Sequence, residues 1–289
     1  MNVFALITNP EEPIDLTEDN YYRRTNRKEP YIQTVNGELR SYAICPSCQN
    51  PTVMVNRTAT ETRSGSFYAR HHKGDVRGVA NYNERRYLTC RLANAARMDQ
   101  KVRRPSSRKE ESDEVKVALV EAFDLVVSFI ESDTGVRFVD RVLEEMLEDF
   151  AKNKGYEYSA INLYNLPYAF AYMTESKDIY GCSVSNEVAE EINKLSEGFW
   201  ARSYFGLHYI NRKEGGRSKI RLLFFGHTES MKNGGRESIV MRVVEIPPGA
   251  EVDTARVLYE KSIILDSAKF YNYYMKRKRR VEMARSKLC

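Results

Sequence analysis

The sequence predicts an α+β protein, with a small β-rich, zinc-ribbon-like module at the N-terminus and a larger domain of helices and antiparallel strands after it. Three observations lead to this prediction. Short β-type runs and a Cys-x-x-Cys motif fill the first hundred residues, helical periodicity follows a polar break near residue 105, and three strand-like runs precede a basic C-terminal segment. We therefore expect two domains, residues 1–105 and 106–289.

The composition is that of a globular chain with enough mass for a packed core. Of its 289 residues, 42% are hydrophobic and 29% are charged. No apolar run reaches the roughly 18 residues needed to cross a bilayer, and the first residues lack the basic start of a secretory signal. Five cysteines, an odd number spread over the chain, argue against a disulfide framework. We therefore expect a cytoplasmic protein with reduced thiols and no membrane partner.

The first domain is expected to consist of short strands. Residues 31–44 form two alternating runs around Asn36-Gly37, a turn pair that tolerates positive φ and typically closes a hairpin. The runs 51–57 and 66–72 are rich in β-branched and aromatic residues. They predict two further strands.

The second domain is expected to follow a linker at residues 102–112, where proline, serines and mixed charge interrupt any periodicity. Apolar residues then recur at helical spacing in two stretches, which predicts two helices. The first stripe consists of Val115, Leu119, Ala122, Val126 and Ile130, and the second of Val139, Val142, Leu143, Met146 and Phe150.

The rest of the second domain is expected to be a helix, an antiparallel meander and a final helix. Residues 185–197 have helical periodicity, and strand-like runs follow at 198–210, 219–227 and 237–247. Glycines in the connections favour antiparallel pairing of these runs. The tail, residues 267–287, is aromatic at its front and basic at its back, and it predicts a C-terminal helix.

The chain contains one Cys-x-x-Cys motif, Cys45-Pro46-Ser47-Cys48, directly after the predicted hairpin. A thioredoxin-like redox pair would open a helix, because the helix N-terminus lowers the pKa of a thiol. Pro51 and the β-branched residues after it predict a strand instead. A tight Cys-x-x-Cys turn directs two thiolates at one point, so the motif predicts half of a zinc site.

Zinc needs two more nitrogen or sulfur ligands, and candidates follow downstream. We predict His71 and Cys90, which would complete a structural site of three cysteines and one histidine. Neighbouring strand residues face opposite sides, and Phe67 and Ala69, on the side of His71, have core character. His71 is therefore favoured, with His72 as the alternative. A site that uses both histidines and leaves Cys90 free is also open.

The order of these features resembles the N-terminal zinc-finger segment of competence CoiA-like proteins: a hairpin, the knuckle "CPSC", short strands and the strand end "FYARHH". The resemblance covers residues 31–91 and implies that Cys45, Cys48 and a histidine bind zinc. In that family a restriction-endonuclease-like domain follows, with Asp and Glu-x-Lys metal ligands. Here Glu114-Val115-Lys116 has the spacing but starts a predicted helix, so we do not extend the resemblance to a nuclease site.

Basic residues are concentrated in two blocks that flank an acidic middle. Residues 57–109 contain 14 Lys/Arg and 4 Asp/Glu, residues 111–150 contain 3 and 12, and residues 269–287 contain 8 and 1. This asymmetry favours a polyanionic partner for the basic blocks. Acidic helices that dock on the basic module and neutralise it would also explain the pattern.

Tyrosines stand beside many of these basic residues, a combination in which rings stack on bases and cations neutralise phosphates. We therefore predict nucleic acid, DNA or RNA, as the partner. The predicted contacts are Arg70, Lys73, Arg85 and Arg86 near the zinc site, and Tyr273, Lys276, Arg277 and Arg280 along one surface of the C-terminal helix. We interpret Tyr164, Tyr168, Tyr172 and Tyr204 as core residues instead.

The favoured hypothesis is a zinc-containing accessory protein, bacterial or phage in character, that binds nucleic acid and has no catalysis of its own. One alternative is a divergent metal-dependent nuclease of the CoiA-like kind. The other is an interaction subunit whose basic blocks contact an acidic protein surface. The sequence does not separate the first hypothesis from the last.

Overall fold

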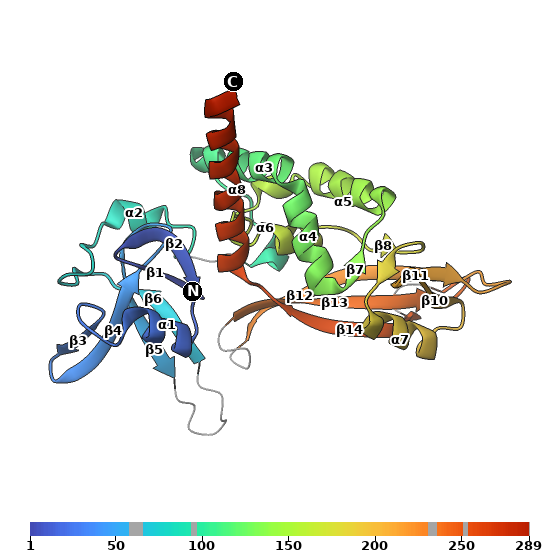
Figure 1. The fold of residues 1–289 in the computed structure, drawn as a ribbon, viewed down its shortest axis with the longest axis horizontal. Helices are drawn as coiled ribbons and strands as arrows, with labels where there is room; N and C mark the ends of the chain where they lie inside the picture. Colours follow the sequence, from blue (N-terminus) through green and yellow to red (C-terminus); the bar gives the residue numbers. More distant parts are fainter. Residues whose placement is uncertain (58–65, 94–96, 231–235, 251–253, 289) are drawn as a thin grey trace.

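The computed structural model describes residues 1–57, 66–93, 97–230, 236–250 and 254–288. It contains both helices and antiparallel sheets, and a β-rich region with a cysteine cluster comes first, which confirms the predicted α+β class. Figure 1 shows this β-rich region on one side and the remaining sheets on the other, with the long helix α8 (Ser267–Leu288) rising between them.

Within the described residues, the N-terminal sheet has six antiparallel strands. Five follow the order β2-β1-β4-β5-β6, and β3 pairs with β4 beside them. Asn36 and Gly37 take φ values of 52° and 83° between β3 and β4, so the predicted hairpin is confirmed. The strands are β1 (Val3–Leu6), β2 (Asn9–Asp15), β3 (Ile32–Val35), β4 (Glu38–Ile44), β5 (Pro51–Arg57) and β6 (Ser66–His71).

Both faces of this sheet bury small hydrophobic clusters. Helix α1 (Glu18–Thr25) contributes Tyr21 to one cluster, together with Phe4, Leu16, Ala43, Met54 and Ala69. The other cluster consists of Ala5, Tyr42, Ile44, Val76 and Val79. Neither approaches the size of the core in the second part of the chain. Hydrophobic burial alone therefore gives this region a modest core.

One residue of the predicted linker, Arg104, is buried against the second part of the chain. Arg104 is only 9% exposed, and its guanidinium donates hydrogen bonds to the Oγ of Ser112 and to the carbonyls of Tyr156 and Ile161. Arg104 therefore anchors the predicted linker to the second part of the chain, although most other residues of 102–112 are exposed.

The first predicted helix is divided in two, because Ala122 leaves the helical conformation with a φ of −133°. Its apolar stripe still faces the core, and all members of both predicted stripes lie in the large hydrophobic cluster or pack against it. The helices after α1 are α2 (Glu84–Leu88), α3 (Lys109–Glu121), α4 (Phe123–Thr134), α5 (Asp140–Lys152), α6 (Leu166–Tyr172), α7 (Asn186–Leu195) and α8, with short 3-10 turns at Met98–Gln100, Ser106–Arg108 and Gly155–Glu157.

The predicted single meander is wrong, because its strands belong to two sheets. The run 198–210 folds back on itself at Phe205-Gly206, and the resulting hairpin pairs with β9 in the order β10-β11-β9-β7. The other sheet has the order β14-β13-β12-β8 and includes a strand, β14, that we did not predict. The bounds are β7 (Val136–Arg137), β8 (Lys177–Asp178), β9 (Ser183–Val184), β10 (Phe199–Tyr204), β11 (Leu207–Arg212), β12 (Lys219–Ser230), β13 (Arg236–Ile246) and β14 (Arg256–Ile264).

The two parts of the chain meet through polar contacts. The Nδ2 of Asn272 on α8 donates to the carbonyl of Pro13 at 2.8 Å. Ion pairs join Arg236 to Asp15 and Arg91 to Glu114. Among the helices that the structure describes, none has the length and apolar character to cross a bilayer.

Candidate metal centre

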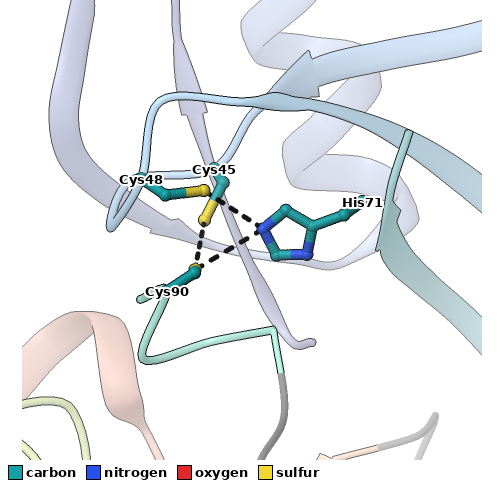
Figure 2. Close-up of side chains that lie close together, drawn as sticks. All are labelled: Cys45, Cys48, His71 and Cys90. Carbon is teal, nitrogen blue, oxygen red and sulfur yellow. Dashed lines mark hydrogen bonds between the residues drawn. The ribbon is translucent and has the colours of Figure 1, made fainter. Parts of the chain in front are cut away.

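Four side chains from distant parts of the N-terminal region converge on one point. The sulfurs of Cys45, Cys48 and Cys90 and a ring nitrogen of His71 all lie within 4.8 Å of one another (Figure 2). The Cys45 and Cys90 sulfurs are 3.6 Å apart, and the Nε2 of His71 lies 3.3 Å from the Cys48 sulfur and 3.6 Å from the Cys90 sulfur. Three thiols and an imidazole in this arrangement are compatible with a metal site.

The backbone of the β4–β5 connection forms the cysteine knuckle. The N–H of Cys45 donates to the carbonyl of Asn50 at 2.9 Å, and the N–H of Gln49 donates to the carbonyl of Cys45 at 2.8 Å. Gln49 takes a φ of 59°, which closes the turn tightly. Both cysteines are buried. The knuckle predicted from the Cys-x-x-Cys spacing therefore forms at a strand-to-strand turn.

Strand alternation places His71, and not His72, in the cluster. His71 ends β6 on the same face as Ala69, which is buried against the first hydrophobic cluster. His72 faces the other side, where its ring lies 5.7 Å from the ring of Tyr42. The fourth candidate ligand, Cys90, comes after helix α2, and its N–H donates to the carbonyl of Tyr87 at 3.0 Å.

Asn50 connects the knuckle to the segment that carries Cys90. Its side chain is 1% exposed and its Nδ2 donates to the Cys48 sulfur at 3.3 Å and to the carbonyl of Asn83 at 3.0 Å. Its Oδ1 accepts from the N–H of Asn83 at 2.6 Å. Asn83 in turn caps α2 by accepting from the N–H of Arg86. Sequence reasoning missed Asn50, since no local pattern separates it from an ordinary turn asparagine.

Three of the four candidate ligands, Cys45, Cys48 and His71, have pKa values shifted by burial and by their neighbours in the cluster. Burial raises the pKa of the Cys45 thiol. Hydrogen bonds with the Cys45 and Cys90 thiols lower the pKa of Cys48. Burial acts to lower the pKa of His71, but hydrogen bonds to Cys48 and Cys90 outweigh it and raise the pKa to about 9. A cation that binds to these groups must therefore displace protons.

Three of the four predicted basic contacts lie close to the cluster. The Nζ of Lys73 lies 5.2 Å from the ring centre of Tyr87, whose ring contacts that of His71. Arg85 and Arg86 lie on α2 and are exposed. Arg70 is exposed as well, but strand alternation puts it on the opposite face of β6 from His71.

The predicted contacts on α8 differ in their surroundings. Tyr273 is 55% exposed, with its ring 6.0 Å from that of Phe129. Arg277 forms an ion pair with Asp124. Lys276 and Arg280 are exposed, and neither forms an ion pair within the part of the chain that the structure describes. Two of the four residues are thus partly engaged by the protein itself.

No known protein family matches the chain, and no curated protein or solved structure is significantly similar to it. The chemistry of the residues is therefore the basis for inferring a role. Among the described residues, Cys45, Cys48, His71 and Cys90 form the only group of three or more His, Cys, Asp and Glu side chains placed to hold a metal ion.

Proposed function

We propose that the cluster binds zinc and that the zinc is structural. Zinc bonds of about 2.3 Å to sulfur and 2.0–2.1 Å to nitrogen put two sulfurs of a tetrahedral site about 3.8 Å apart, and sulfur and nitrogen about 3.6 Å apart. Three separations between the ligand atoms are close to these values, 3.6 Å for Cys45 and Cys90 and 3.3 and 3.6 Å from His71 to Cys48 and Cys90, and all pairs lie within 4.8 Å. Four protein ligands fill the tetrahedron, so no position is open for a substrate or a reactive water.

In this proposal the zinc stabilises the N-terminal region by joining three of its segments. The ligands come from the β4–β5 knuckle, the end of β6 and the turn after α2. Small domains with thin cores commonly depend on such a cross-link, because the free energy of metal binding adds to that of folding. The small hydrophobic clusters of this region fit that requirement.

We infer that the zinc-bearing region binds nucleic acid as an accessory factor without catalysis of its own. The observation that supports this most is the exposure of Lys73, Arg85 and Arg86 around the metal cluster. None of the three forms an ion pair with any residue that the structure describes. Exposed cations without carboxylate partners are suited to phosphates, because contact releases counterions from the nucleic acid.

The likeness to the zinc-finger segment of CoiA-like proteins stays part of this proposal for residues 31–91 only. Glu114 and Lys116 lie on helix α3, and Glu114 forms an ion pair with Arg91. A Glu-x-Lys nuclease motif would instead lie on a sheet beside a catalytic aspartate. The proposal therefore does not include a nuclease site.

Metal analysis and a salt series test the proposal together. We expect about one zinc per purified chain, and a log affinity for a labelled oligonucleotide that falls linearly with log salt. Replacing Lys73, Arg85 and Arg86 by Ala should lower the slope by roughly 0.7–0.9 for each phosphate interaction that the substitutions remove. Stability should hardly change, because exposed charges contribute little to it.

A matched variant controls for net charge. Lys152, Lys154 and Lys194 are exposed on the helical part of the chain, and replacing them by Ala removes the same charge far from the metal ligands along the sequence. The salt slope of this variant should equal that of the wild type. Equal slopes in all three proteins would place the phosphate interactions elsewhere. Absence of any binding at low salt would favour an acidic protein partner, and absence of metal would reject the zinc site.

A further inference from the structure

The β10–β11 hairpin presents aromatic residues to solvent on one face. Directly paired residues of an antiparallel hairpin share a face, and the pairs Trp200 with Asn211, Arg202 with Tyr209, and Tyr204 with Leu207 lie together. We call these six residues the aromatic face. The opposite face is buried through Phe199, Ala201 and Ile210. The aromatic face is therefore the solvent side of a hairpin anchored to the core from behind.

Two tyrosines of this face are exposed. Tyr204 is 66% exposed and Tyr209 is 37% exposed. The prediction that Tyr204 packs in the core is wrong, because strand alternation directs it away from Phe199 and Ala201. By contrast, Tyr164 and Tyr168 are buried as predicted, and Tyr172 packs against the core from its margin.

The tip of the hairpin extends the aromatic face with Phe205, whose backbone conformation and exposure are both unfavourable for a phenylalanine. Phe205 is 98% exposed and takes a φ of 48°, and Gly206 follows with a φ of 79°. This two-residue turn favours Asn, Asp or Gly at its first position, because a side chain in the left-handed region is strained. Neither the backbone preference of phenylalanine nor burial of its side chain therefore explains why Phe205 occupies this position. Such a residue marks a candidate contact for a partner.

The charge on this face indicates the kind of partner. The guanidinium of Arg202 lies 4.1 Å from the ring centre of Trp200, and the residue is exposed. None of the six residues of the aromatic face is acidic. Rings interleaved with an arginine and without carboxylates are suited to stacking on bases while the cation meets phosphates.

We propose that the aromatic face and Phe205 form a stacking platform for the unpaired bases of single-stranded nucleic acid. The inference rests on the proposed function and adds the kind of nucleic acid and a second contact region. Trp200, Arg202 and Tyr204 alternate along β10, so successive side chains on this face are about 6.8 Å apart. Bases stacked in a duplex are about 3.4 Å apart. The spacing therefore suits bases that are splayed out along a sheet.

The chain supplies its own probe for this interaction, because Trp200 is its only tryptophan. Adding an unlabelled single-stranded oligothymidylate of about 16 nucleotides to the full-length protein should quench tryptophan fluorescence as bases stack on the ring. A duplex of the same length should quench much less at the same salt concentration. Quenching that is equal for the two, or absent while the oligonucleotide is bound, would overturn the proposal.

Substitutions at the tip separate stacking from general hydrophobic contact. Phe205→Ala should weaken single-strand affinity by about tenfold, with an unchanged salt slope because the substitution removes no charge that meets a phosphate. Phe205→Tyr should retain the wild-type affinity, and Phe205→Leu should behave like the alanine variant. Leu39, exposed on the β3–β4 hairpin, provides a control, since Leu39→Ala removes an apolar side chain elsewhere.

The outcomes distinguish this inference from the proposed function. If Lys73, Arg85 and Arg86 determine the salt slope but the Phe205 variants bind like wild type, the platform is refuted and the zinc-region proposal stands. If Phe205→Leu binds like wild type while Phe205→Ala does not, the tip is an apolar contact rather than a stacking one, which also refutes the platform. Complete absence of nucleic-acid binding would refute both.

Discussion

Asn50→Ala should weaken metal binding although Asn50 is not a ligand. The substitution removes the Nδ2 group that donates to the Cys48 sulfur, and both hydrogen bonds that join the knuckle to Asn83. Loss of a group that supports a metal ligand typically lowers metal affinity by about 10–100-fold. That range corresponds to about 1.4–2.7 kcal/mol.

The same substitution should lower the free energy of unfolding of the N-terminal region. Each of the two hydrogen bonds to Asn83 contributes about 1 kcal/mol, and the weaker metal binding adds to this loss at a fixed zinc concentration. We therefore expect a total loss of about 3.4–4.7 kcal/mol for the metal-loaded protein, the sum of the two hydrogen bonds and the lost metal affinity. The alanine side chain cannot satisfy the N–H and carbonyl of Asn83, so solvent must enter for these groups to be paired.

Competition with a chromophoric chelator measures the metal affinity, and denaturant unfolding followed by circular dichroism measures the stability. Gln49→Ala is the matched control, because Gln49 belongs to the same turn but, among the residues that the structure describes, its side chain bonds only to Glu11 and Arg86 at the surface. It should change stability by less than about 0.5 kcal/mol. Wild-type metal affinity in Asn50→Ala would refute the role assigned to this side chain.

Three further predictions concern other parts of the molecule. Cys90→Ser should release the metal and remove hydrogen-exchange protection from the described part of residues 31–91. The large core cluster contains no candidate metal ligand and should stay protected. Loss of protection in both regions would contradict the prediction. Burial acts to raise the pKa of Glu245, but its hydrogen bonds outweigh burial and hold the pKa below the ordinary 4.5. The ionised Glu245 therefore stabilises the folded protein above pH 4.5, and this stabilisation is lost as the pH falls through the pKa of the folded state. Glu245→Gln should therefore lower stability by about 2 kcal/mol at pH 7 and flatten its acid dependence, and an unaltered pH profile would argue against this. Replacing both Lys276 and Arg280 by Ala should lower the salt slope for nucleic-acid binding with little change in melting temperature; an unchanged slope would mean that this end of α8 is only a solvated basic helix.

Local patterns in the sequence predicted the turns and side-chain directions that depend on a few neighbouring residues. Asn36-Gly37 specifies a hairpin because both positions need positive φ, and the Cys45-x-x-Cys48 spacing specifies a knuckle because a tight turn brings two thiols together. The alternation along β6 predicted that His71 lies on the face of Ala69. These features hold in the structure because each depends on a few consecutive residues.

The other features of the fold depend on pairing between distant segments, and local sequence patterns carried no signal for that pairing. The run 198–210 is strand-like in sequence, as are the strands of the neighbouring sheet, but it folds into a hairpin at Phe205-Gly206 whose second strand pairs with β9. Arg104 looked like a linker residue until its acceptors, which lie far along the chain, were brought together. Composition shows which polar groups a segment contains, but the tertiary structure determines which of them form hydrogen bonds.

The candidate metal centre shows the same division between sequence and tertiary structure. The sequence by itself determined the residue types that could bind zinc and the two thiols that must act together. The tertiary structure decided that Cys90 completes the set, that Asn50 holds its segment against the knuckle, and that an aromatic face lies on a hairpin far along the chain from these ligands. The physical reason is that a turn's geometry is set by the φ and ψ preferences of its own residues, whereas the approach of Cys90 to Cys45 depends on how all the intervening strands pack.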